Sequence, residues 1–286
     1  MRTAGRPERS TRNMKNEKIT ELYQYYSNVD YAINVIRDAK LFCSKAKSFN
    51  DPFDGSIPFD IDDDPSDFVA AAYRTYKKDG HDWSSIKSIL TSHLCENGEL
   101  SADTKSLIKN TAEEFKKQNE NAGIVCLTED PLSVLMWSHY ANKHKGVCIG
   151  FQRSADNDLG DDDACIPVTY SDSYPAPKFS QIYESTGSLT EALLFTKAKK
   201  WAYEKEWRLM VDEGDAFGKL PGEIISVILG CRFPDENLLK VREACGKKGI
   251  KLFRAIQSPT QFALDLVPDD SDEAHDIHTE NGGSLW

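Results

Sequence analysis

Hydrophobic positions along the chain form short clusters whose spacing changes between that of strands and that of helices. Strand-like apolar stretches lie at 21–27, 40–44, 123–128, 147–151, 165–170, 203–210, 223–229, 251–256 and 261–266. Helical spacing appears between them without regular alternation, which argues against a doubly wound or barrel α/β fold. The pattern predicts an α+β fold: one domain with a mixed, mainly antiparallel sheet of about eight or nine short strands and flanking helices.

Three consecutive helical patterns, at 66–78, 83–95 and 101–119, interrupt the strands. We expect them to form a helical insertion, near residues 65–120, that covers one side of the sheet in a single domain spanning 19–267. Residues 1–18 contain four arginines and no apolar segment, so we expect a disordered basic arm rather than a secretory signal. Residues 268–286 are polar and acidic, and we expect a loose tail.

The net charge of −11, from 35 Lys and Arg against 46 Asp and Glu, argues against general nucleic-acid binding. Many acidic residues are concentrated in three segments, 60–67, 156–163 and 269–280, so the rest of the chain is closer to neutral. A phosphate-bearing cofactor or an RNA acceptor is therefore compatible with the composition. No apolar run reaches the roughly 18 residues that a membrane-spanning helix needs, so we expect no membrane association.

The seven cysteines are scattered and include no Cys-x-x-Cys pair. Most lie in apolar, strand-like stretches, which predicts buried free thiols in a reducing cytoplasm. A structural zinc site requires closer spacing, and we expect no bound metal.

The strongest local motif runs from Trp201 to Leu209 and contains two carboxylates and an arginine among aromatic residues. On a strand, Glu204, Glu206 and Arg208 lie on one face. The guanidinium can then hold one carboxylate ionised while the other orients or deprotonates a nucleophile. The alternative is a solvated edge strand with a surface ion pair that contributes little.

Two further clusters contain polar and aromatic residues. In the segment 136–146, His139 is either a core histidine or a catalytic residue, and Tyr140 is either core packing or a shelf for a flat ring. In the segment 44–54, Asn50, Asp51 and Asp54 either bind a cation or ligand hydroxyls or satisfy the backbone of their own turn.

Three motifs, FNDPFD at 49–54, MWSHYA..H.G at 136–146 and YE.EWR at 203–208, resemble the bacterial family called domain of unknown function 2971. The resemblance covers about Leu22 to Leu266. The chain departs from that family at Tyr26, where members commonly carry a basic residue, usually Arg.

The layout also resembles that of ADP-ribosyltransferases, in which an early strand carries His or Arg, a second carries Ser, and a late strand carries Glu. This resemblance implies that NAD is a substrate, with Glu206 contacting the ribose and the developing cation and Glu204 activating the acceptor. It implies a transferase or NAD hydrolase that suits a toxin or anti-phage effector, with protein or RNA as acceptor. Taking the resemblance and the local clusters together, we expect Glu206 and Glu204 to be catalytic. The expected cofactor-binding residues are Tyr26, Ser44, Asn50, Asp51, His139, Tyr140 and Arg208.

Two other functions remain as alternatives. A metal-dependent nuclease or phosphoesterase would use Asp51, Asp54, His139 and Glu206. A non-enzymatic module would use the same aromatic and acidic residues to bind a small molecule or a partner.

Overall fold

The computed structural model describes residues 16–55, 64–175, 178, 180 and 186–270. Most of the expected basic arm and of the expected acidic tail lies outside these residues. Two parts of those segments are described, and both are ordered. Residues 16–18 form a turn. Asp269 is buried and accepts hydrogen bonds from Arg242 and Arg254, so the expectation of a loose tail is wrong at this position.

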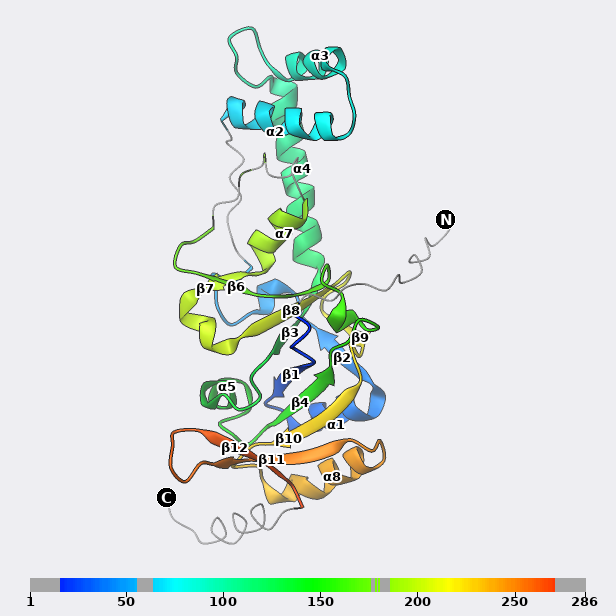
Figure 1. The fold of residues 1–286 in the computed structure, drawn as a ribbon, viewed down its shortest axis with the longest axis vertical. Helices are drawn as coiled ribbons and strands as arrows, with labels where there is room; N and C mark the ends of the chain where they lie inside the picture. Colours follow the sequence, from blue (N-terminus) through cyan, green and yellow to red (C-terminus); the bar gives the residue numbers. More distant parts are fainter. Residues whose placement is uncertain (1–15, 56–63, 176–177, 179, 181–185, 271–286) are drawn as a thin grey trace.

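The main sheet has eight strands in the order β12-β11-β10-β4-β1-β3-β8-β5 (Figure 1). Neighbouring strands pair antiparallel, except for the parallel pair of β10 and β11. The predicted α+β fold with a mixed, mainly antiparallel sheet is confirmed. The strands are β1 (Glu21–Tyr26), β3 (Gly123–Thr128), β4 (Val147–Gln152), β5 (Cys165–Pro167), β8 (Glu206–Val211), β10 (Ile224–Leu229), β11 (Lys251–Gln257) and β12 (Leu264–Pro268).

Two small sheets lie beside the main one. In the first, β2 (Lys40–Cys43) pairs with β9 (Ala216–Lys219), and in the second, β6 (Thr169–Ser171) pairs with β7 (Thr196–Ala198). A bridge joins Ser44, the residue after β2, to Ile124, the second residue of β3. The segment that follows β2 is therefore held against the main sheet.

Helices α1 (Val29–Asp38) and α8 (Asp235–Gly246) contact each other and pack on the largest core cluster of the sheet. The α1 helix begins after Asn28, whose side chain accepts a hydrogen bond from the backbone N–H of Tyr31. Short 3₁₀ helices lie at η1 (Ala46–Ser48) and η2 (Asp158–Gly160), and helix α5 (Val134–Tyr140) follows β3. Among the described residues, no helix has the length and apolar character needed to span a bilayer.

The stretch before the acidic motif differs from the prediction. The sequence predicts a helix from Ser188 to about Trp201 and a strand from Tyr203, but helix α7 (Thr186–Leu194) ends earlier. Strand β7 and a 3₁₀ helix, η3 (Lys199–Glu204), follow it, and β8 begins only at Glu206. Strand β7 places Lys197 in the interior, where its side chain meets three carboxylates.

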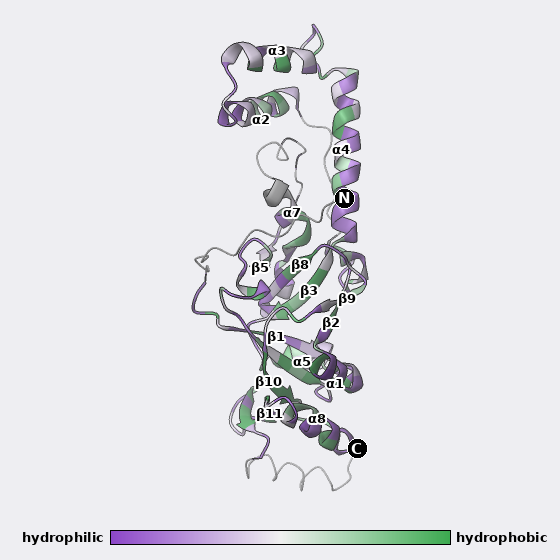
Figure 2. Cartoon of the chain, turned by 90° about the vertical axis from the view of Figure 1, so that its right-hand side faces the viewer, coloured by the Kyte–Doolittle hydropathy of each residue, from purple (hydrophilic) through white to green (hydrophobic). Residues whose placement is uncertain are grey.

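The helical insertion comprises α2 (Pro65–Lys78), α3 (Trp83–His93) and α4 (Ala102–Asn121). It does not cover the sheet as expected, because α4 leads away from the sheet and places α2 and α3 beyond its end (Figures 1 and 2). The three helices begin at side-chain caps from Asp64, Asp82 and Ser101. They enclose a small separate core around Phe68 and Ile108, which allows the helical insertion to stand apart from the main core.

Candidate functional site

A cavity of about 320 Å³ opens between β1, β3, β8, α5 and the segment after β2. This volume is near the lower end of the roughly 300–1,000 Å³ of small-molecule sites. Aromatic side chains form part of the wall: Tyr23, Tyr25, Phe42, Phe49 and Tyr140. The polar and charged side chains include Ser44, Asn50, Asp54, Lys197, Glu204, Glu206 and Arg208.

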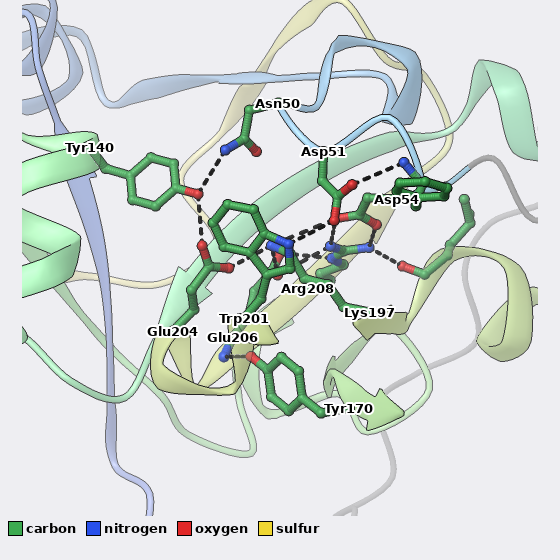
Figure 3. A network of polar contacts seen from close by, with 12 residues as sticks. Asn50, Asp51, Asp54, Tyr140, Tyr170, Lys197, Trp201, Glu204, Glu206 and Arg208 are labelled. Carbon is green, nitrogen blue, oxygen red and sulfur yellow. Dashed lines mark hydrogen bonds and ion pairs between the residues drawn. The ribbon is translucent and has the colours of Figure 1, made fainter. Parts of the chain in front are cut away.

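Arg208 is fully buried and joins two carboxylates in the cavity wall (Figure 3). Its Nε donates to Oε1 of Glu206 at 2.7 Å, and its Nη2 donates to Oε2 of the same residue at 3.1 Å. Its two terminal nitrogens donate to the two carboxylate oxygens of Asp54 at 2.8 and 2.6 Å. The guanidinium also lies over the ring of Phe49, 4.9 Å from the centroid. These bidentate interactions with the guanidinium fix both carboxylates in place.

Lys197 is a second buried cation beside Arg208. Its Nζ lies 2.5 Å from Oε2 of Glu204, 2.9 Å from Oε2 of Glu206 and 3.6 Å from Oδ2 of Asp54. The ammonium also lies 5.2 Å from the ring of Trp201. Sequence reasoning missed this residue, because nothing in the local sequence distinguishes Lys197 from Lys199 and Lys200, which are exposed.

Glu204 is linked through Tyr140 to the loop after β2 (Figure 3). The Tyr140 hydroxyl donates to Oε1 of Glu204 at 2.7 Å and accepts from Nδ2 of Asn50 at 3.1 Å. The backbone around Glu204 is also fixed, because its carbonyl accepts from Thr128 Oγ1 at 2.6 Å. Lys205 then adopts φ 45° and turns the chain into β8. Both acidic side chains consequently face the cavity although only Glu206 belongs to the strand.

The surroundings move the pKa values of the two glutamates in opposite directions. Burial raises the pKa of Glu204, and the nearby Lys197 only partly offsets this effect. Burial acts in the same direction on Glu206, but Arg208 and Lys197 outweigh it and hold the pKa of that carboxyl below its usual value. Burial would lower the pKa of Lys197, but Glu206 and Glu204 raise it well above its ordinary value, so the side chain stays charged.

Six of the nine residues expected from the sequence meet at the cavity: Ser44, Asn50, Tyr140, Glu204, Glu206 and Arg208. Tyr26 does not, because it lies in the core on the opposite face of β1 and packs against Tyr31. Tyr23 and Tyr25 line the cavity instead. The structure therefore separates Tyr26 from the other expected residues at this cavity, since a one-residue change along a strand moves a side chain to the other face.

Asp51 and His139 also lie outside the cavity wall. Asp51 accepts hydrogen bonds from the indole Nε1 of Trp201 at 2.7 Å and from the backbone N–H of Phe53 at 3.0 Å. The second bond lies within its own turn, as the alternative interpretation of this segment expects. His139 is exposed on α5. The metal-dependent alternative required both of these residues together with Asp54 and Glu206, so its set is not assembled. The described residues contain no group of three or more His, Cys, Asp or Glu placed to hold a metal.

A second hollow, of about 350 Å³, shares Asp54 and Lys197 with the first. Its wall includes two exposed aromatic residues, Phe53 and Tyr174, whose rings meet edge to face with centroids 6.0 Å apart. The buried ion pairs therefore form a partition between two hollows.

A family model described as "Protein of unknown function (DUF2971)" matches residues 136–209. The match covers 74 of the 286 residues, so the chain is similar to this family over that segment. The DUF2971 segment contributes Tyr140, Lys197, Glu204, Glu206 and Arg208, whereas Asn50 and Asp54 come from outside it. No curated protein and no solved structure matches the chain.

Proposed function

We propose that this protein cleaves the nicotinamide–ribose bond of NAD, either transferring ADP-ribose to an acceptor or hydrolysing the cofactor. One observation carries the proposal. Glu204 and Glu206 share the ammonium group of Lys197 in an aromatic-lined cavity, and their pKa values are displaced in opposite directions. Two carboxylates with separated pKa values are the usual arrangement for dividing acid–base and electrostatic roles.

The proposed chemistry follows from the charge that develops during glycosidic cleavage. When the bond between nicotinamide and C1 of the ribose breaks, the electron pair leaves with nicotinamide and positive charge develops on the sugar. Glu206, held ionised by Arg208 and Lys197, stabilises that charge. Glu204 has the higher pKa of the pair and takes the proton from the water or acceptor hydroxyl that attacks C1.

The remaining parts of the cavity have positioning roles in this proposal. Tyr140 stacks on the nicotinamide ring, and Ser44 and Asn50 contact the ribose. The second hollow gives the acceptor access to the ion cluster, which comprises Asp54, Lys197, Glu204, Glu206 and Arg208. All seven cysteines are free thiols, which supports activity in a reducing cytoplasm. Consumption of NAD suits a toxin or anti-phage effector that acts on protein or RNA.

The test is nicotinamide release from NAD by the purified full chain, measured by chromatography with and without protein and RNA acceptors. Glu206→Gln should reduce the rate by about a hundredfold or more, since it removes the charge facing the transition state. Glu223→Gln changes an exposed residue just before β10; it is the matched control and should leave the rate unchanged. Wild-type protein that neither binds nor cleaves NAD would refute the proposal. Binding without cleavage would favour the non-enzymatic ligand-binding alternative.

A further inference from the structure

Two exposed phenylalanine rings lie at the edge of the cavity. Phe42 on β2 and Phe217 on β9 are direct partners across the two-stranded sheet, with ring centroids 5.4 Å apart at 71°. The exposed fractions are 36% for Phe42 and 64% for Phe217. Tyr31 extends the cluster, with its ring centroid 6.5 Å from that of Phe217. Apolar rings gathered at the mouth of a cavity indicate a surface that a ligand or partner covers.

Strand β2 connects this aromatic cluster to the interior of the cavity. Phe42 and Ser44 are two positions apart and both line the cavity, while the alternate residues Leu41 and Cys43 are buried in the core. The strand therefore leads from Ser44 inside the cavity to Phe42 at its rim, and Phe217 lies next to Phe42 outside the cavity wall.

The volume of the cavity limits how much of a dinucleotide it encloses. NAD has two ring-bearing nucleosides joined by a pyrophosphate, and a cavity of about 320 Å³ is near the lower end of the range for small-molecule sites. When the nicotinamide half lies beside Glu206, the other half must lie outside the cavity. Its adenine is a flat aromatic ring that needs an apolar face.

We propose that the adenine ring of the bound dinucleotide stacks on the Phe42–Phe217 cluster. The inference rests on the proposed function, because it takes the nicotinamide half to occupy the cavity. The other exposed aromatic pair, Phe53 and Tyr174, is the less suitable platform. Those residues line the second hollow, and Asp54 and Lys197 separate it from the cavity.

Calorimetric titration of the full chain with NAD and with nicotinamide mononucleotide, which lacks the adenosine half, tests the proposal. Phe217→Ala should raise the Kd for NAD about fivefold to a hundredfold, within the range known for loss of one base–aromatic stack. It should leave the Kd for nicotinamide mononucleotide unchanged. Phe217→Trp keeps a ring at this position and should retain wild-type affinity. Phe262→Ala removes a fully exposed ring outside the cavity wall and serves as the control.

Three results would overturn the inference. An unchanged NAD affinity in Phe217→Ala, with normal binding by the wild type, would refute adenine stacking alone. A loss caused by Phe53→Ala instead would assign the adenine to the second hollow. Failure of the wild type to bind either ligand would refute the stacking and the proposed function together.

Discussion

The Nζ of Lys197 lies 2.5 Å from Oε2 of Glu204, although the two residues belong to different elements and both are nearly excluded from solvent. The same ammonium contacts Glu206 and Asp54. Lys197 therefore neutralises part of a buried group of three carboxylates. Its removal takes the cationic partner from Glu204, while Arg208 still pairs with Glu206 and Asp54.

Replacement of Lys197 by methionine should lower the free energy of unfolding by about 3–5 kcal/mol, because breaking one side of a buried ion pair leaves uncompensated charge. Urea unfolding at neutral pH measures the change. The matched control is Lys199→Met, two positions along the chain, whose exposed pair with Asp172 should contribute at most about 1 kcal/mol. Equal decreases in the free energy of unfolding for the two variants would contradict the role of Lys197 in neutralising the buried carboxylates.

Tyr140→Phe should move the pH dependence of nicotinamide release. The Tyr140 hydroxyl donates a hydrogen bond to Glu204 and lowers the pKa of that carboxyl, so losing the hydroxyl raises the pKa further. A base works in its deprotonated form, and the acidic limb of kcat/KM should therefore shift to higher pH.

The control for this shift is Tyr174→Phe, which removes a hydroxyl from the half-exposed ring beside the second hollow. Its pH profile should match that of the wild type. A limb that stays in place or moves to lower pH in Tyr140→Phe would contradict the assignment of Glu204 as the base.

The sequence indicated the centre of the site through local spacing. Glu204, Glu206 and Arg208 alternate beside aromatic residues, although the same pattern also fits a solvated edge strand. Ser44 followed from the resemblance to ADP-ribosyltransferases, and Asn50 and Tyr140 were candidates from their local polar and aromatic clusters. Their meeting depends on the bridge between Ser44 and Ile124, which no local pattern predicts.

The errors have equally specific causes. Strand β1 carries three tyrosines at 23, 25 and 26, and composition does not reveal which of them faces the core. Lys197 was missed because a lysine on a short strand looks like surface until its three carboxylate partners are known. Asp54 was considered as a ligand of a cation, as a partner of ligand hydroxyls or as a turn residue, whereas its partner Arg208 lies 154 positions later in the chain.

The geometry of the loop that joins α5 to β4 leads to a further prediction about stability. Residues 142–144 all have positive φ, between 46° and 69°, and Gly146 follows with its backbone close to β1. A Cβ at Gly146 would lie 2.1 Å from the carbonyl oxygen of Tyr26, and backbone cannot move aside cheaply. Gly146→Ala should therefore lower the free energy of unfolding by about 1–3 kcal/mol, measured by urea unfolding.

The end of α8 offers a control for that substitution. At Gly246 a new Cβ would meet nothing within 4 Å, and the residue belongs to the helix. Gly246→Ala should leave stability unchanged or raise it by up to about 1 kcal/mol, because alanine is the better helix former. A similar loss at both glycines would show that the close approach to Tyr26 is not the cause.

The most direct test of the proposed activity is a crystal structure of the Glu206→Gln variant soaked with NAD. The substitution should slow cleavage enough to retain the intact dinucleotide while keeping the shape of the cavity. We predict that nicotinamide lies against Tyr140 and that the ribose lies within hydrogen-bonding distance of residue 206. A cavity without NAD, in crystals whose solvent channels reach it, or a dinucleotide bound elsewhere on the protein would contradict the account.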